Sequence, residues 1–107
     1  MSKINEIVHE LLSHGILAEV LSLKNGDIAY SFLGFAKSGQ GTLFEKDNKL
    51  YLATRYDQID EINDTVDVVK VAFSWDKRYS HSVNYPNTNF LTEDNNWWSL
   101  YKKYNLI

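Results

Sequence analysis

Two apolar stretches on either side of a short polar turn constrain the fold of this chain more than any other feature. Residues 16–23 (ILAEVLSL) and 28–36 (IAYSFLGFA) flank the segment Lys24-Asn25-Gly26-Asp27. Asn-Gly tolerates the positive φ angles of a tight turn, so this segment predicts a β-hairpin. A hairpin joins antiparallel strands, and the pattern therefore argues against a parallel sheet.

A second pair of strands is predicted further along the chain. Residues 42–46 and 50–56 flank a turn at residues 47–49. The preceding Ser38-Gly39-Gln40-Gly41 is rich in glycine, but no Lys-Ser/Thr follows it and it does not open a helix, as phosphate binding would require. We interpret it as a hairpin loop. The sequence thus predicts a four-stranded antiparallel meander.

Helical spacing marks both ends of the chain. A helix over residues 3–14 is predicted by an apolar stripe, and Gly15 can end it in the left-handed conformation. The stripe consists of Ile4, Ile7, Val8, Leu11 and Leu12. A last helix is predicted over residues 93–104, with Thr92 as its cap.

Residues 64–80 are ambiguous between helix and strand. Val66, Val68, Val69 and Val71 are β-branched and favour a strand. Alternation fails at Val68–Val69, however, and Asp64 is a suitable helix N-cap. We therefore expect a helix here, and the whole chain predicts an α+β fold: an N-terminal helix, the four-stranded sheet and two C-terminal helices.

Length and composition narrow the function classes. A chain of 107 residues, 44% of them hydrophobic, suits a single domain over residues 1–107. The N-terminus shows no secretory signal and no stretch is long and apolar enough to span a membrane, so we expect a cytoplasmic protein without membrane contact. The net charge of −3 argues against sequence-independent nucleic-acid binding.

Acidic residues are concentrated in one short run. Residues 57–67 carry five acids and no base, namely Asp57, Asp60, Glu61, Asp64 and Asp67. The order of these acids does not match an EF-hand calcium loop. The run is therefore either a solvated loop between a strand and a helix or a negative surface for a basic partner.

Adjacent tryptophans provide the second candidate. Trp97 and Trp98 lie about 100° apart around a helix, so they cannot both face the same core. We expect Trp97 to anchor the core. Trp98 then either covers a sheet edge or contributes to an interface, where tryptophan is enriched.

Catalytic and metal-binding patterns do not stand out. His9 and His14 are five residues apart and cannot share a ligand, and the chain has no cysteine. No nucleophile elbow is present. We therefore expect no metal, no cofactor and no enzyme activity. Arg78 and His81, joined by Arg55, remain candidate contacts for an anion or nucleotide.

The C-terminal part resembles a group of small proteins. Residues 51–62 (YLATRYDQIDEI), followed by Val68-Val69, Trp75 and a tryptophan-rich terminal helix, are similar to small uncharacterised accessory proteins of bacteriophages and mobile elements of low-GC bacteria. The resemblance covers residues 43–107 and implies inhibition of a host defence system by binding a host protein. It transfers no functional residue.

These observations predict a non-enzymatic protein-binding module. Its expected contact surface combines Asp57, Asp60, Glu61 and Asp64 with Trp98. A host protein is the expected partner, with self-association as a further option. The alternative is a small-ligand or nucleotide-binding protein with an aromatic-lined pocket.

Overall fold

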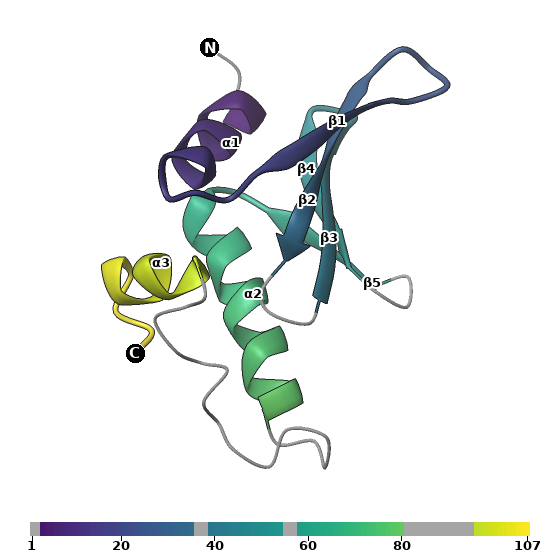
Figure 1. The fold of residues 1–107 in the computed structure, drawn as a ribbon. Helices are drawn as coiled ribbons and strands as arrows, with labels where there is room; N and C mark the ends of the chain where they lie inside the picture. The colour runs from purple at the N-terminus through teal and green to yellow at the C-terminus, as the bar shows by residue number, and fades with distance from the viewer. Residues whose placement is uncertain (1–2, 36–38, 55–57, 81–95) are drawn as a thin grey trace.

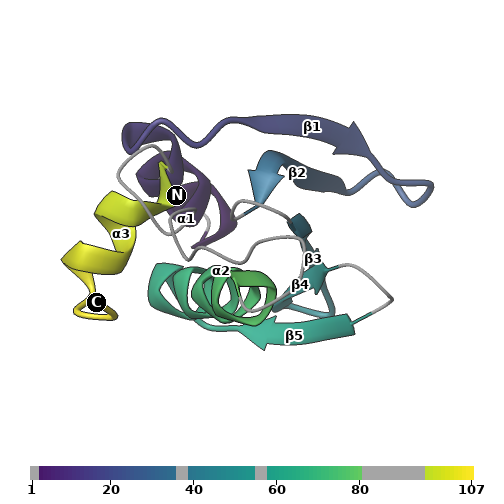
Figure 2. The same cartoon turned by 60° about the horizontal axis from the view of Figure 1, so that its bottom comes forward.

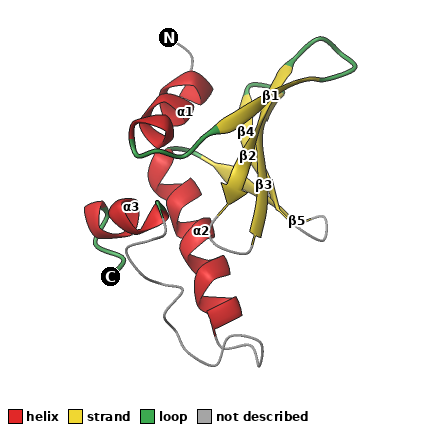
Figure 3. Ribbon diagram, in the orientation of Figure 1, coloured by secondary structure: helices red, strands yellow, loops and turns green. Residues whose placement is uncertain are grey.

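Three helices pack on one side of a five-stranded antiparallel sheet in the part of the chain described by the computed structural model, residues 3–35, 39–54, 58–80 and 96–107 (Figure 1). Colouring by secondary structure makes the separation plain, with the helices together and the strands beside them (Figure 3). The predicted α+β class is confirmed.

The sheet is a meander in which each strand pairs with the next along the chain, in the order β1-β2-β3-β4-β5. All four pairings are antiparallel. The strands are β1 (Ala18–Ser22), β2 (Ile28–Phe35), β3 (Gly39–Lys46), β4 (Lys49–Thr54) and β5 (Gln58–Ile62). This order leaves β1 and β5 as the two edges of the sheet.

Both predicted hairpin turns are present, with different geometries. In the β1–β2 turn the Leu23 N–H donates to the Asp27 carbonyl at 2.8 Å, and Gly26 adopts a φ of 90°. This is a three-residue loop that ends in a left-handed glycine. In the β3–β4 turn Asp47 and Asn48 have φ angles of 54° and 66°, the signature of a two-residue type I′ turn.

Two expectations about the strands were wrong. The predicted four strands are five, because the acidic run contains β5 instead of being a loop throughout. An edge strand needs few apolar residues, and in β5 only Ile62 is buried, so its pattern resembles that of a loop. The glycine-rich segment is also strand from Gly39 onward, where Gly41 pairs with Phe32 of β2 and with Thr54 of β4. Glycine can take part because ladder hydrogen bonds involve only the backbone.

The helices follow the predictions more closely. Helix α1 (Lys3–Ser13) ends just before Gly15, whose φ is 83°. Residues 64–80 are helical, as α2 (Thr65–Ser80). Helix α3 (Trp97–Lys103) begins later than the predicted residue 93, and the expected cap at Thr92 lies outside the described residues.

The core lies between the helices and the concave side of the curved sheet. Figure 2 shows the sheet bending around α2, with α1 and α3 beyond it. Every helix and four of the strands contribute buried apolar side chains: Ile4, Ile7, Leu11, Ile16, Phe32, Leu43, Leu50, Leu52, Ile62, Val68, Val69, Ala72, Trp75, Trp97, Leu100 and Tyr101. Helix α2 is therefore packed on the sheet on one side and on α3 on the other.

Candidate functional site

The convex side of the sheet, opposite the three helices, is not covered by any element that the structure describes (Figures 1 and 2). The register identifies the side chains on it, because partners across a ladder share a face. A row across the sheet runs through Leu21, Ala29, Phe44, Tyr51 and Glu61. We call this side the open face.

The centre of the open face is aromatic. Phe44 of β3 and Tyr51 of β4 are direct cross-strand partners, and their rings stack with centroids 5.7 Å apart and an interplanar angle of 27°. Both side chains are half-buried. The pair presents ring surface to solvent, and stacked aromatic pairs at a surface are common anchors for a partner.

The β5 end of the open face combines apolar surface with an exposed ion pair. Ile59, 57% exposed, lies on this face beside Ala53 of β4. Glu61 faces Tyr51 across the ladder and lies 3.9 Å from the Lys49 ammonium. Both partners of this ion pair are more than half exposed, so it is screened and contributes little to stability.

The predicted acidic residues therefore separate into different environments. Glu61 lies on the open face, whereas Asp60 lies on the opposite side of β5 and accepts a 3.3 Å hydrogen bond from the Gln58 side chain. Asp57 and His81 lie outside the described residues. Arg78 belongs to α2, in its last turns.

Asp64 has a structural role at the start of α2. Its carboxylate accepts a hydrogen bond from the Asp67 N–H at 3.1 Å, and the Asp67 carboxylate accepts one from the Asn63 N–H at 2.8 Å. This reciprocal arrangement closely resembles a capping box and confirms Asp64 as the N-cap. The negative charges also complement the positive end of the helix dipole.

Trp98 belongs to α3, which lies apart from β5, the strand that carries Asp60 and Glu61. Helix α3 lies on the other side of α2 from β5 in both views (Figures 1 and 2). Trp97 is 2% exposed and anchors the core, as predicted. Trp98 is half-buried against that core with Lys102 Nζ 6.0 Å from its ring centroid, and its Nε1 is buried without a hydrogen bond in the described part of the chain.

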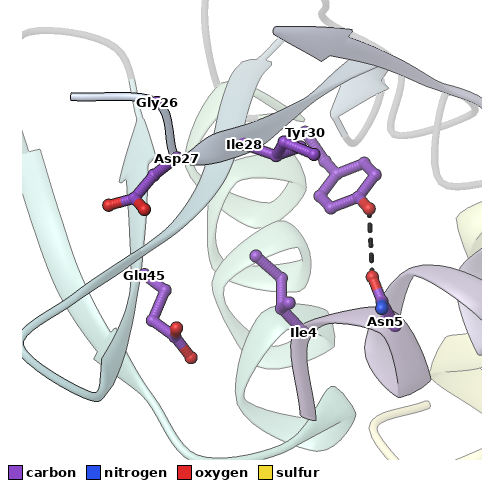
Figure 4. A pocket seen from close by; sticks show the side chains of 7 residues that line it. All are labelled: Ile4, Asn5, Gly26, Asp27, Ile28, Tyr30 and Glu45. Carbon is purple, nitrogen blue, oxygen red and sulfur yellow. Dashed lines mark hydrogen bonds between the residues drawn. The ribbon is translucent and has the colours of Figure 1, made fainter. Parts of the chain in front are cut away.

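A hollow of about 340 Å³ lies between α1, the β1–β2 turn and β3 (Figure 4). The Tyr30 hydroxyl donates to Asn5 Oδ1 at 3.0 Å on one wall. The charged side chains on its lining, Asp27 and Glu45, are both acidic. Such a lining repels phosphate, and Tyr30 is its one aromatic residue, so this hollow does not match the aromatic-lined nucleotide pocket of the alternative prediction.

Sequence reasoning missed a buried polar pair between α2 and α3. Asp76 is fully buried, and the Tyr101 hydroxyl donates to its Oδ2 at 2.5 Å. Burial, together with the nearby Asp76 carboxylate, raises the pKa of Tyr101 far above its ordinary value, so the hydroxyl stays protonated as a donor. A polar residue on the buried stripe of α2 is the only sequence signal that could have indicated this pair.

A second polar cluster joins the two ends of the chain. Glu10 of α1 accepts hydrogen bonds from the Lys103 ammonium at 3.0 Å and from the Tyr104 hydroxyl. Burial alone would raise the pKa of Glu10, but these hydrogen bonds and one from Thr65 outweigh it and lower the pKa. Burial and the bond to Glu10 raise the pKa of Tyr104 to about 12. These hydrogen bonds hold α1 against the C-terminal end of α3, and their role is structural.

The described residues form neither a metal-binding cluster nor a membrane-spanning helix. No group of three or more His, Cys, Asp or Glu side chains comes together there in a way that could hold a metal ion. His14 instead pairs through Nδ1 with the Ser99 hydroxyl at 2.9 Å. None of the described helices combines the length and apolarity needed to cross a bilayer.

Comparison with known proteins adds no relationship. The chain matches no protein-family model, and searches of curated proteins and of solved structures find no significant match.

Proposed function

We propose that this chain is a non-enzymatic protein-binding module that engages its partner through the open face of the sheet, at the end formed by β3, β4 and β5. The observation that carries the proposal is the continuity of Phe44, Tyr51, Ile59 and Glu61 on one uncovered surface. Stacked rings and an exposed isoleucine provide apolar contact area, and the exposed Lys49–Glu61 ion pair gives the surface a charged rim of both signs.

The partner that fits this surface is a protein with an apolar centre and, at its edge, a basic residue opposite Glu61 and an acidic residue opposite Lys49. Complementary charge raises the association rate and fixes the orientation of a complex, while the desolvated centre supplies most of the affinity. Of the predicted acidic contact residues, Glu61 is part of the proposed binding surface. Phe44 and Tyr51 provide the aromatic contact that the sequence analysis assigned to Trp98. An anti-defence inhibitor acting on a host protein, as the resemblance to phage accessory proteins implies, is one protein of this kind.

The test is an affinity capture from a low-GC bacterial lysate with three tagged forms of the full chain. These are the wild type, the double variant Ile59→Lys/Glu61→Lys, and Leu12→Lys. Leu12, 50% exposed on helix α1, is similar in exposure to Ile59 at 57% and controls for a general effect of a new surface lysine. Circular dichroism establishes that all three forms are folded.

We expect one stoichiometric protein to be retained by the wild type and by Leu12→Lys and to be lost from the double variant. Loss of a hot spot costs about 2 kcal/mol or more, which corresponds to about thirtyfold in affinity. Equal capture by all three forms would place the binding surface elsewhere. Retention of a nucleic acid or a small molecule alone would contradict the proposed function itself.

A further inference from the structure

The other edge of the sheet, strand β1, carries an unusual concentration of exposed apolar side chains. Within the described chain β1 pairs only with β2, so one side of its backbone has no strand partner. Most of the large exposed hydrophobic residues lie in this strand, next to it in the sequence or at the start of its partner β2: Leu17, Val20, Leu21, Leu23 and Ile28. Exposed apolar patches of this kind mark interaction sites.

The two edges of the sheet differ in a way that points to β1. Proteins protect edge strands from pairing with charges, prolines, bulges or inward-pointing polar residues. Strand β5 (QIDEI) has such protection, with Asp60 on its inner side and Glu61 on its outer side. Strand β1 (AEVLS) has no proline or lysine and pairs with β2 without a register shift, and Glu19 is its one charge.

The hydrogen bonds of the β1–β2 turn identify the free backbone groups of β1. The Leu23 N–H donates to the Asp27 carbonyl, so this pair is a hydrogen-bonded one. Hydrogen-bonded and non-hydrogen-bonded pairs alternate along an antiparallel ladder. Glu19 and Leu21 therefore direct their N–H and C=O groups to β2. Ala18, Val20 and Ser22 direct theirs outward.

We propose that two copies of this chain associate through antiparallel pairing of their β1 strands, with the two-fold axis at Val20. In this register Val20 faces Val20 of the second copy, and Ala18 faces Ser22 of the second copy. Every outward N–H and C=O group of β1 then meets a partner of the opposite kind. The two sheets become one continuous sheet with β5 at each end.

The side chains are complementary in the same register. Leu17 and Leu23 flank β1, and Leu17 lies opposite Leu23 of the second copy. Glu19 lies opposite Leu21 of the second copy, so no like charges face each other directly. The association buries apolar surface that is otherwise exposed on each copy. A two-fold contact is also closed, and therefore produces a dimer and not a filament. The inference does not depend on the proposed function, because the β3–β5 end of the open face remains free.

The first experiment measures the mass of the full chain by sedimentation over a wide concentration range. One chain has a mass of 12.4 kDa, and we expect the wild type to sediment with twice that mass. Val20→Pro removes an N–H that points outward and leaves the pairing with β2 intact, as edge strands permit. We expect Val20→Pro and Val20→Lys to sediment as monomers and the matched surface control, Ile59→Lys, to remain dimeric.

The second experiment tests the register. The chain has no cysteine, so introduced thiols are the only ones present. Residues facing each other in a non-hydrogen-bonded pair have Cα atoms about 4.5 Å apart, within the range of a disulfide. Diagonal neighbours are about 7–8 Å apart, which is too far. We expect Glu19→Cys mixed with Leu21→Cys to form a disulfide-linked dimer on oxidation, and either variant alone to cross-link far less.

Three results would overturn the proposal. A wild type that remains monomeric at the highest concentration would exclude the dimer. A dimer that survives both Val20→Pro and Val20→Lys would place the contact elsewhere. A dimer in which Glu19→Cys and Leu21→Cys cross-link equally well alone and mixed would exclude the register centred on Val20.

Discussion

At the scale of single residues, the buried carboxylate of Asp76 has the strictest requirements in the described structure. It is fully buried between α2 and α3, where a carboxylate without donors is costly. The Tyr101 hydroxyl satisfies one of its oxygens, and Phe73 packs against the Tyr101 ring at a centroid distance of 5.0 Å. One side chain of α3 thus provides both apolar packing and a hydrogen-bond donor to Asp76.

Removing the Tyr101 hydroxyl should therefore lower the free energy of unfolding more than removing the hydroxyl of a more accessible tyrosine. We expect Tyr101→Phe to lower the free energy of unfolding by about 2–3 kcal/mol, because a buried charged acceptor loses a donor. Tyr104→Phe is the matched control, since its hydroxyl also donates to a carboxylate but in a more accessible place, and about 1 kcal/mol is expected there. Urea denaturation measures both. Equal losses would show that burial of Asp76 does not set the cost.

At the scale of elements, α2 is specified largely by its own first turn. The valines of residues 66–71 favour strand, yet the Asp64 carboxylate accepts a hydrogen bond from the Asp67 N–H, a donor that a helix start leaves free. Strand β5, in contrast, is not specified by its own residues. Its polar composition does not specify a strand, and pairing with β4 decides its conformation.

The cap can be tested without altering the core. We expect Asp64→Ala to lower the free energy of unfolding by about 1 kcal/mol, the usual cost of losing an N-cap. Asp64→Asn retains the acceptor oxygen and should cost less than half as much. Thermal or urea unfolding of the two variants gives the comparison. If the alanine variant retained full stability, the cap would not be what starts α2.

At the scale of the whole molecule, the first and last helices hold each other in place. Glu10 binds Lys103 and Tyr104, His14 binds Ser99, and the Asn96 side chain donates to the Gly15 carbonyl at 3.1 Å. Residues at opposite ends of the sequence thus form one polar seam beside the core. The fold of α1 and that of α3 are consequently coupled.

This seam predicts a pH dependence of stability. The pKa of Glu10 is lowered from 4.5 by its hydrogen bonds in the folded state, so its contribution is present above 4.5 and is lost as the pH falls through the lower, folded value. At neutral pH we expect Glu10→Gln to cost about 1 kcal/mol. Below pH 4.5 the difference between variant and wild type should shrink. Urea denaturation at several pH values measures it, and a constant difference would contradict the role assigned to Glu10.

Local signals in the sequence determined most of the elements. The helical stripe of α1, the two hairpin turns and the Asp64 cap each depend on neighbouring residues, which is why the α+β class and the helical state of residues 64–80 could be predicted. The anchoring role of Trp97 follows from helical spacing alone.

Only the tertiary structure decided the fifth strand, the Asp76–Tyr101 pair and the composition of the candidate surface. Each depends on contacts between residues far apart in the chain, and composition and spacing carry no information about such contacts. The sequence could identify acidic and aromatic residues as candidates for binding. Pairing of β4 with β5 placed Glu61 beside Tyr51. Packing of α3 on α2 placed the helix that carries Trp98 on the other side of α2 from β5. A sheet register and a helix position are set by the whole core at once.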